Sequence, residues 1–357
     1  MSSRPSVSRA RPRATRLSRS IARVSAGAEP ANASSSGRRP LRVVITGGSK
    51  GLGKAIVEQF AAGGDAVLTC GRSEEALRSA HGESGSGGVR WVHGIDVGSA
   101  NCMARLSDAA QEELGGVDVW INNAGTNCYT FETLQTTDPA VLEEVVRTNL
   151  LGTIFASRVA IDLMAKQAEG GHVFCMEGAG SDGNPTRKYA AYGFTKAGMG
   201  QLSKSLSDEC RQEEGGPPIT VSTLSPGIVY TELISCGDAT FGKWGRWVIN
   251  SIAEEADVVA GALVPRIREY VANPANERSA GRIAYLTPAL ALEKLMRRLL
   301  KGENKDRFAP EDRDGELGRM RLEWTPALES AFDKLLIAGH QSSLLLASFL
   351  AAFTRAE

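Results

Sequence analysis

Short apolar runs of five or six residues alternate along this chain with longer runs in which apolar positions recur every three or four residues. The short runs are typical of buried strands, and the longer runs of amphipathic helices. Strands that alternate with helices in this way predict an α/β fold in which helices cover both faces of a doubly wound parallel sheet. The predicted strands are 41–46, 66–70, 89–93, 117–122, 172–176, 219–224 and 282–287.

The connection between the sixth and seventh predicted strands is unusually long. It covers about 228–280 and contains Phe241, Trp244, Trp247 and Ile249. Long insertions at the carboxyl edge of a sheet commonly form substrate lids, so we predict a lid here. Ordinary packing of the insertion on the core would require the same apolar side chains.

Charge is unevenly distributed along the chain. The formal net charge is zero, but residues 1–40 contain nine Arg, ten Ser and a single acidic residue, Glu29, which leaves 32 basic and 40 acidic side chains in the remainder. Such an N-terminus is typical of an organelle transit peptide, although a disordered basic tail has the same composition. Because the remainder is acidic and has no basic stripe interleaved with aromatic residues, we expect no nucleic-acid partner.

The six cysteines are scattered, without a C-x-x-C pair, and the four histidines are equally dispersed. This usage fits a reducing compartment and argues against a disulfide framework. It also predicts no metal site, since the clustered ligand spacing of zinc sites is missing from the sequence.

A C-terminal helical extension is predicted over 291–357. Within it, residues 327–353 have the pattern of one or two amphipathic helices that end in an apolar patch. The apolar run is too short to cross a bilayer. It would either contact a lipid surface or a partner helix, or cover the protein's own core.

A glycine-rich turn joins the first predicted strand to the first predicted helix. Residues 46–53 read TGGSKGLG, the spacing T-G-x-x-x-G-x-G. Glycines at these positions let the backbone turn tightly and approach a pyrophosphate, whose charge is favoured at a helix N-terminus. The turn therefore predicts a dinucleotide site built from Gly47, Ser49, Lys50, Gly51, Leu52 and Gly53.

Tyr192 and Lys196, in the run YGFTK, are four residues apart and share one face of a predicted helix. The ammonium favours the phenolate, so we expect Lys196 to lower the pKa of Tyr192 from its ordinary value of about 10. The phenol would then exchange a proton near neutral pH. Beside a hydride donor, this pair predicts the reduction of a carbonyl group.

Over roughly 41–290, these motifs and three others resemble the classical short-chain dehydrogenase/reductase family. The others are NNAG at 122–125, RTNLLG around Asn149, and SPGIVYT at 225–231. The resemblance implies a single Rossmann-type domain in which Asn149 holds a water of the proton relay and Asp96 lies near the adenine ring. It further implies that Asn123, Ala124, Gly125, Tyr192, Lys196, Pro226, Gly227 and Thr231 contact the cofactor.

The charges near the expected cofactor ribose favour NADPH over NADH. Gly71 occupies the position after the second strand at which a carboxylate would accept hydrogen bonds from a ribose diol. Arg72 follows it, and Lys50 adds a second cation inside the glycine turn. Two cations without a carboxylate favour a 2′-phosphate.

One position departs from the family pattern. The family's catalytic serine corresponds to Ala179, and the nearest hydroxyl in the run FCMEGAGSDG is Ser181. That serine donates to the substrate carbonyl, and losing such a donor costs about 2 to 4 kcal/mol of transition-state stabilisation unless another group replaces it. Either Ser181 or a backbone NH substitutes, or the substrate needs less polarisation, or the protein is not catalytic.

The run GHVFCMEGAGSDGNPTRKYAAYGFTKAG, together with the stretches TLSPGIVYTELI and INSIAEEADVVAGALVPRIRE, resembles the plant and algal chlorophyll b reductases, and in particular their shorter form without membrane-spanning segments. This resemblance implies that NADPH reduces the 7-formyl group of chlorophyll b or chlorophyllide b to a hydroxymethyl group. It places the protein in the chloroplast, in the stroma or on the stromal face of the thylakoid membrane. The implied partners are antenna complexes, the membrane-spanning form of the enzyme and other copies in an oligomer.

Two other functions are consistent with the residues. The first is a plastid reductase of another hydrophobic carbonyl, such as a quinone or an acyl-carrier substrate. The second is a non-catalytic NADPH-binding scaffold, which Ala179 alone favours. The combination of Tyr192, Lys196 and Asn149 argues against the scaffold, because no structural role requires all three at these spacings.

Overall fold

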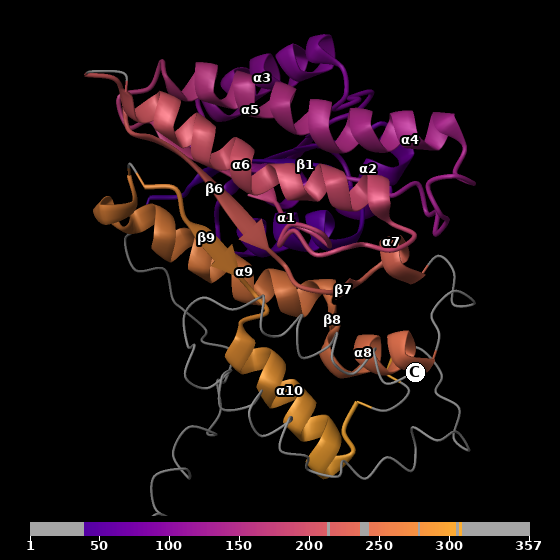
Figure 1. Ribbon diagram of the computed structural model, residues 1–357. Coiled ribbons are helices and arrows are strands. Elements are labelled where there is room, and N and C mark those ends of the chain that lie inside the picture. The colour runs from indigo at the N-terminus through magenta and orange to yellow at the C-terminus, as the bar shows by residue number, and fades with distance from the viewer. Residues whose placement is uncertain (1–38, 213–214, 236–242, 278, 305–306, 309–357) are drawn as a thin grey trace, which may run out of the picture. The chain divides into compact units, whose positions relative to one another are not determined.

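The computed structural model describes residues 39–212, 215–235, 243–277, 279–304, 307 and 308. Within these ranges one sheet contains seven strands: β1 (Arg42–Thr46), β2 (Ala66–Cys70), β3 (Val89–Val92), β4 (Val119–Asn122), β5 (Gly171–Met176), β6 (Ile219–Ser225) and β9 (Arg282–Ala284). Their order is β3-β2-β1-β4-β5-β6-β9, and every neighbouring pair is parallel. The order reverses at β1 and β4, which confirms the predicted Rossmann-type doubly wound α/β fold (Figure 1).

Helices cover both faces of this sheet. Helices α1 (Gly51–Ala62) and α9 (Ala256–Ala272) pack on one face, and α3 (Ala100–Leu114), α5 (Gly152–Met164) and α6 (Ala190–Gln212) on the other (Figure 1). Hydroxyl caps fix several helix starts; the Ser99 side chain, for example, accepts from the N–H of Cys102 at the start of α3. The remaining elements around the sheet are α2 (Glu74–His81), α4 (Pro139–Val146), α10 (Pro288–Lys301), the 3₁₀ turns η1 (Ser86–Gly88) and η3 (Pro274–Asn276), and the π-helical turn η2 (Arg147–Leu151).

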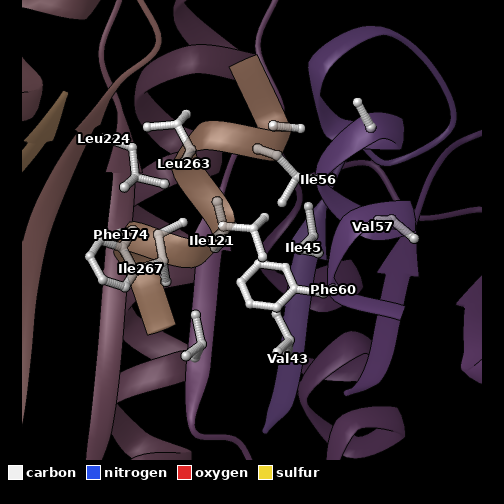
Figure 2. Packing of buried hydrophobic residues seen from close by; sticks show 14 of the residues in the cluster. Val43, Ile45, Ile56, Val57, Phe60, Ile121, Phe174, Leu224, Leu263 and Ile267 are labelled. Atoms are coloured by element: carbon white, nitrogen blue, oxygen red, sulfur yellow. The ribbon is translucent and has the colours of Figure 1, made fainter. Parts of the chain in front are cut away.

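The core between α1, α9 and the sheet is shown in Figure 2. Ile56 and Phe60 of α1 and Leu263 and Ile267 of α9 are all fully buried, and they meet above Ile121 of β4. Burying a side chain of this size stabilises the fold by roughly 1.5–3 kcal/mol. The contact therefore fixes α9 to α1 at the side of the sheet where the glycine turn lies.

Helix α9 changes the extent of the predicted substrate lid. The prediction assigned about 228–280 to the lid, but residues 256–272 form this core helix. The reason is the helical spacing of Val259, Leu263 and Ile267, which gives α9 a continuous apolar face toward α1. Only the first half of the insertion remains available as a lid.

The described residues of that first half form four short elements: β7 (Val229–Tyr230), α7 (Glu232–Ser235), α8 (Lys243–Ile252) and β8 (Glu254–Glu255). Strands β7 and β8 pair with each other in parallel, separately from the main sheet. Of the predicted lid residues, Ile249 is buried and Trp247 half-buried; both belong to α8, as does Trp244. Phe241 lies outside the described residues.

The predicted terminal segments fall largely outside the described residues. Of the predicted transit peptide, 1–40, only residues 39 and 40 are described. The whole predicted helical segment 327–353 lies outside the described residues. The predicted extension from 291 begins inside α10, which starts at Pro288 because Thr287 caps it and accepts from the N–H of Leu290. Of the helices in the described ranges, none combines the length and the apolar character needed to cross a membrane.

Candidate active site

A cavity of about 690 Å³ lies at the carboxyl ends of the central strands, where the strand order reverses. The loops that follow β1, β2, β4, β5 and β6 all contribute to its wall. This is the position at which doubly wound sheets bind their ligands. Every residue predicted to contact the cofactor, from Gly47 to Thr231, lines this cavity.

The glycine turn after β1 requires glycine on steric grounds. Gly47 and Gly51 have φ of +70° and +55°, in the left-handed region that favours glycine. A Cβ on Gly53 would lie 2.2 Å from the carbonyl oxygen of Gly47 and 2.3 Å from Nδ2 of Asn123. Lys50, the N-cap of α1, provides no side-chain cap, so the first N–H groups of the helix have no such partner. The turn therefore fits a pyrophosphate.

Asn123 of the NNAG motif holds the glycine turn in place. Its Nδ2 donates to the carbonyl oxygens of Thr46 at 3.0 Å and Gly47 at 3.1 Å. The backbone N–H groups of Asn123 and Ala124 both donate to Oγ1 of Thr46. The motif thus connects β4 to β1 across the strand reversal and supports the floor of the cavity.

The two cations predicted at the cofactor ribose already have carboxylate partners. The Lys50 ammonium lies 2.8 Å from Oε2 of Glu232 in α7 and also contacts the Tyr129 hydroxyl, and these hydrogen bonds raise the pKa of Lys50. Arg72 pairs with Glu144 of α4 at 3.0 Å. Because both cations are largely exposed, these pairs contribute little stability and leave the cations able to turn to another anion.

Asp96, predicted near the adenine ring, also lines the cavity. Its carboxylate accepts a hydrogen bond from the N–H of Gly98 at 2.9 Å and pairs with Arg147 of η2. These two partners fix the position of the carboxylate.

Tyr192 and Lys196 lie together on the first turns of α6, as the sequence predicts. Both are buried, and the Lys196 ammonium lies 5.7 Å from the centre of the Tyr192 ring. Nζ of Lys196 donates to the carbonyl oxygen of Met176 at the end of β5, at 3.0 Å. Helix α6 and strand β5 therefore hold the pair at the cavity from two directions.

Asn149 lies in the π-helical turn η2 and is almost fully buried. Its Oδ1 accepts from the N–H of Thr126, and its Nδ2 donates to the carbonyl oxygen of Thr126 at 2.9 Å and to Oγ1 of Thr195 at 3.0 Å. Thr195 lies between Tyr192 and Lys196 in α6, so Asn149 connects the loop after β4 to α6. Such π-helical turns frequently occur at functional sites.

Ser181, predicted as a possible substitute for the serine missing at Ala179, directs its hydroxyl to the backbone and not into the cavity. The Ser181 hydroxyl accepts from the N–H of Gly178 and donates its single proton to the carbonyl oxygen of Lys196 at 3.1 Å. Ser181 is not among the described residues that line the cavity, whereas Gly178 and Ala179 are. A Cβ on Gly178 would lie 2.5 Å from the Tyr192 hydroxyl oxygen, so this glycine makes room for the phenol.

The sequence profile of the short chain dehydrogenase family matches residues 42–236. This chain belongs to that family. It is 39% identical over 276 residues to the chlorophyll(ide) b reductase NOL, chloroplastic, of Oryza sativa subsp. japonica, covering 76% of this chain and 79% of that protein. The chlorophyll(ide) b reductase NOL of Arabidopsis thaliana is likewise 39% identical over 277 residues, with coverage of 76% and 78%.

The fold is also that of solved structures. A closed form of serine dehydrogenase complexed with NADP+ superimposes with a TM-score of 0.57 over 69% of this chain and 95% of that chain, at 21% identity. Membership of the family makes the protein an oxidoreductase. Tyr192 and Lys196, both buried beside the cavity, carry side chains of the kind that can exchange a proton with a ligand.

Burial reverses the predicted effect of Lys196 on Tyr192. Instead of lowering the pKa of the phenol, the site raises the pKa of Tyr192 to about 12, because burial disfavours the phenolate. Burial also lowers the pKa of Lys196 to about 8, against the opposing influence of the nearby Cys175 and Glu177. The phenol therefore remains protonated at neutral pH, which suits a proton donor in a reduction.

The lowered pKa of Lys196 gives the reaction a predictable pH dependence. Lys196 is protonated below pH 8 and loses its stabilising charge above it, while Tyr192 remains protonated throughout. We expect kcat/KM for carbonyl reduction to fall about tenfold for each pH unit above 8. In a Lys196→Arg variant the fall should move to higher pH, because a guanidinium stays charged. A wild-type profile that is flat to pH 10 would contradict the assigned role of Lys196.

Several cavity residues were not predicted from the family motifs. Tyr189 and Glu177 lie close in sequence to predicted residues, and Tyr230 lies within the SPGIVYT motif next to Thr231, whereas Tyr129 lies in a connection without a recognised motif. Tyr189 is three residues before Tyr192, and this helical spacing is the sequence signal for its place beside the predicted site. The Tyr189 hydroxyl donates to the carbonyl oxygen of Leu233 at 3.3 Å, which joins the start of α6 to α7.

Proposed function

We propose that this protein is a chlorophyll(ide) b reductase that uses NADPH to reduce the 7-formyl group of chlorophyll b or chlorophyllide b to a 7-hydroxymethyl group. The observation that carries the proposal is the 39% identity to relatives of that name over about three quarters of both chains. The site agrees with this activity, because Tyr192 and Lys196 border a cavity of about 690 Å³ that the glycine turn also lines.

Bound NADPH would supply the hydride to the formyl carbon. Tyr192 donates its proton to the formyl oxygen, and its pKa of about 12 ensures that the proton is present. The Lys196 ammonium stabilises the phenolate that remains. Asn149 holds the water through which the proton returns, and an aldehyde, being more electrophilic than a ketone, needs less help from a hydroxyl at Ala179.

NADPH is proposed over NADH because two cations, Lys50 and Arg72, border the cavity at the expected ribose. Both cations are themselves exposed and would leave their carboxylate partners for the more highly charged 2′-phosphate. Changing both to Gln is expected to raise the KM for NADPH about tenfold or more, with little change for NADH. Lys54→Gln, which removes a cation of α1 that pairs only loosely with Glu58, is the matched control. Equal changes for both cofactors would rule out the assignment.

Substrate preference is the direct test of the proposed function. Purified protein with NADPH should reduce chlorophyllide b with a higher kcat/KM than small soluble ketones. Much faster turnover of the ketones would contradict the pigment assignment. Preference for a quinone or an acyl-carrier carbonyl would instead identify another plastid reductase, and NADPH binding without turnover of any carbonyl would identify a scaffold.

We propose that the protein acts in the chloroplast, in the stroma or on the stromal face of the thylakoid membrane. The relatives carry the word chloroplastic in their names, and the composition of residues 1–40 suits a transit peptide. Proposed partners are antenna complexes, the membrane-spanning form of the enzyme and further copies of the chain. Import into isolated chloroplasts with cleavage near residue 40 would support the location; a full-length protein left outside would contradict it.

A further inference from the structure

Two residues that follow α10, Arg307 and Phe308, contact a wall of the cavity that lies far from them in sequence. This wall, called the β7 wall here, consists of Val229, Tyr230 and Thr231, all of which line the cavity. The Tyr230 hydroxyl donates to the carbonyl oxygen of Phe308 at 2.9 Å. The two aromatic rings stack with their centres 4.5 Å apart and their planes 22° from parallel.

Phe308 also joins the β7 wall to helix α8. Its N–H donates to Oδ1 of Asn250 at 2.8 Å, and Asn250 is fully buried. One residue thus contacts a cavity wall through its ring and carbonyl, and α8 through its N–H. The match to the family profile ends at residue 236. Phe308 and Asn250 lie beyond that residue, and Tyr230 lies before it.

Arg307 reaches the partner strand of the wall. Its guanidinium pairs with Glu254 of β8 and lies 4.6 Å from the centre of the Phe308 ring. Glu254 is buried and also pairs with Lys294 of α10 at 2.6 Å. Burial by itself raises the pKa of Glu254, but the hydrogen bonds from Arg307 and Lys294 hold it at about 2, so the carboxylate remains charged.

The β7 wall needs such an anchor because its own pairing is minimal. Strands β7 and β8 share two residue pairs, Val229 with Glu254 and Tyr230 with Glu255, and join no other described strand. An isolated two-stranded ribbon is at best marginally stable in water. Val229 is also buried in the core cluster that includes α9, whereas Tyr230 is only half-buried, so it is the Tyr230 part of the wall that depends most on contacts made from outside the cavity.

We propose that Arg307 and Phe308 are positioning residues that fix the β7 wall and thereby set the size of substrate that the cavity admits. The inference rests on the proposed function, since it assumes that the cavity reduces a bulky aldehyde. It assigns no chemistry to either residue: Tyr192 and Lys196 retain the proton transfer. Loosening the anchor should therefore weaken the binding of large substrates and leave the reaction of small ones unchanged.

A series of aldehydes of increasing ring size tests this in the full-length protein. With NADPH, Phe308→Ala is expected to raise the KM for 1-pyrenecarboxaldehyde and chlorophyllide b about 2- to 10-fold. This is the loss of affinity that corresponds to the free energy of one aromatic stack. The kcat and KM for benzaldehyde should stay at the wild-type values. Phe308→Tyr keeps the ring and should restore the KM for the large aldehydes.

Arg307→Ala should act in the same direction as Phe308→Ala, and its matched control is Arg297→Ala. Arg297 lies on α10 and forms an exposed pair with Glu293, so its loss should leave the whole aldehyde series unchanged. Thermal unfolding of each variant separates a moved wall from a destabilised fold. If the unfolding temperature falls and the KM changes equally for small and large aldehydes, or changes for neither, the inference is overturned.

The outcome also separates this inference from the proposed function. If the wild type reduces 1-pyrenecarboxaldehyde but not chlorophyllide b, the pigment assignment fails, and the size series still decides the role of Phe308. If the wild type reduces no aldehyde at all, both the proposed function and the inference are contradicted.

Discussion

Replacing Tyr192 with phenylalanine is expected to lower kcat for aldehyde reduction by about 10²- to 10⁴-fold, the usual contribution of a positioned general acid. The phenol lies against Gly178 at the cavity, and burial keeps it protonated. The variant removes one oxygen atom and keeps the ring, so NADPH binding and thermal unfolding should change little. Steady-state kinetics with a soluble aromatic aldehyde measures the effect.

Tyr189→Phe is the matched control for this prediction. The two tyrosine rings are 5.3 Å apart, and Tyr189 also lines the cavity. Its hydroxyl, however, donates to the backbone of Leu233 and has no assigned part in proton transfer. We expect its removal to change kcat far less than Tyr192→Phe. If Tyr192→Phe retained kcat within tenfold of wild type, another group would have to be the acid.

Gly53→Ala is expected to lower the affinity for NADPH by about 10- to 100-fold, which corresponds to the 1–3 kcal/mol that overpacking typically costs. The added Cβ would meet the carbonyl oxygen of Gly47 and Nδ2 of Asn123, and these two atoms are themselves hydrogen-bonded to each other. Neither is the end of a flexible side chain free to move away, so the turn must open. Titration of NADPH fluorescence measures the affinity.

Gly261→Ala serves as the control for this substitution. Gly261 also lies inside a helix, α9, but apart from its chain neighbours and the adjacent backbone of α9 no heavy atom lies within 4 Å of its Cβ position. We expect this variant to bind NADPH normally and to be more stable by about 0.5–1 kcal/mol, because alanine favours a helix over glycine. Similar losses of NADPH binding in both variants would show that the glycine turn is not the pyrophosphate site.

The arrangement of the sheet and the cofactor edge could be predicted because both follow from local patterns. Apolar strand runs bounded by turns predicted all seven strands, and glycine spacing predicted a turn that Gly53 indeed requires on steric grounds. Once the strands are parallel, their carboxyl ends share one edge. Motifs at those ends, such as NNAG after β4, must then lie side by side.

What the sequence could not predict depends on contacts between distant residues. The partner of Lys196 is the carbonyl oxygen of Met176, and burial by surrounding elements, rather than helical spacing, sets the pKa of Tyr192. Ser181 is only two residues from Ala179, yet its hydroxyl turns to the backbone of Lys196. The length of the insertion favours a lid, whereas the helical spacing of Val259, Leu263 and Ile267 places α9 in the core.

The central claim is that this site transfers a hydride from NADPH to the formyl carbon of a chlorophyll b pigment. The most direct measurement is to incubate the protein with chlorophyllide b and NADPH deuterated at the nicotinamide C4 position, and to analyse the pigment by mass spectrometry. The account predicts a 7-hydroxymethyl product that carries one deuterium at the new carbon–hydrogen bond and is lost in Tyr192→Phe. Unchanged chlorophyllide b, in protein that binds NADPH and reduces other aldehydes, would contradict it.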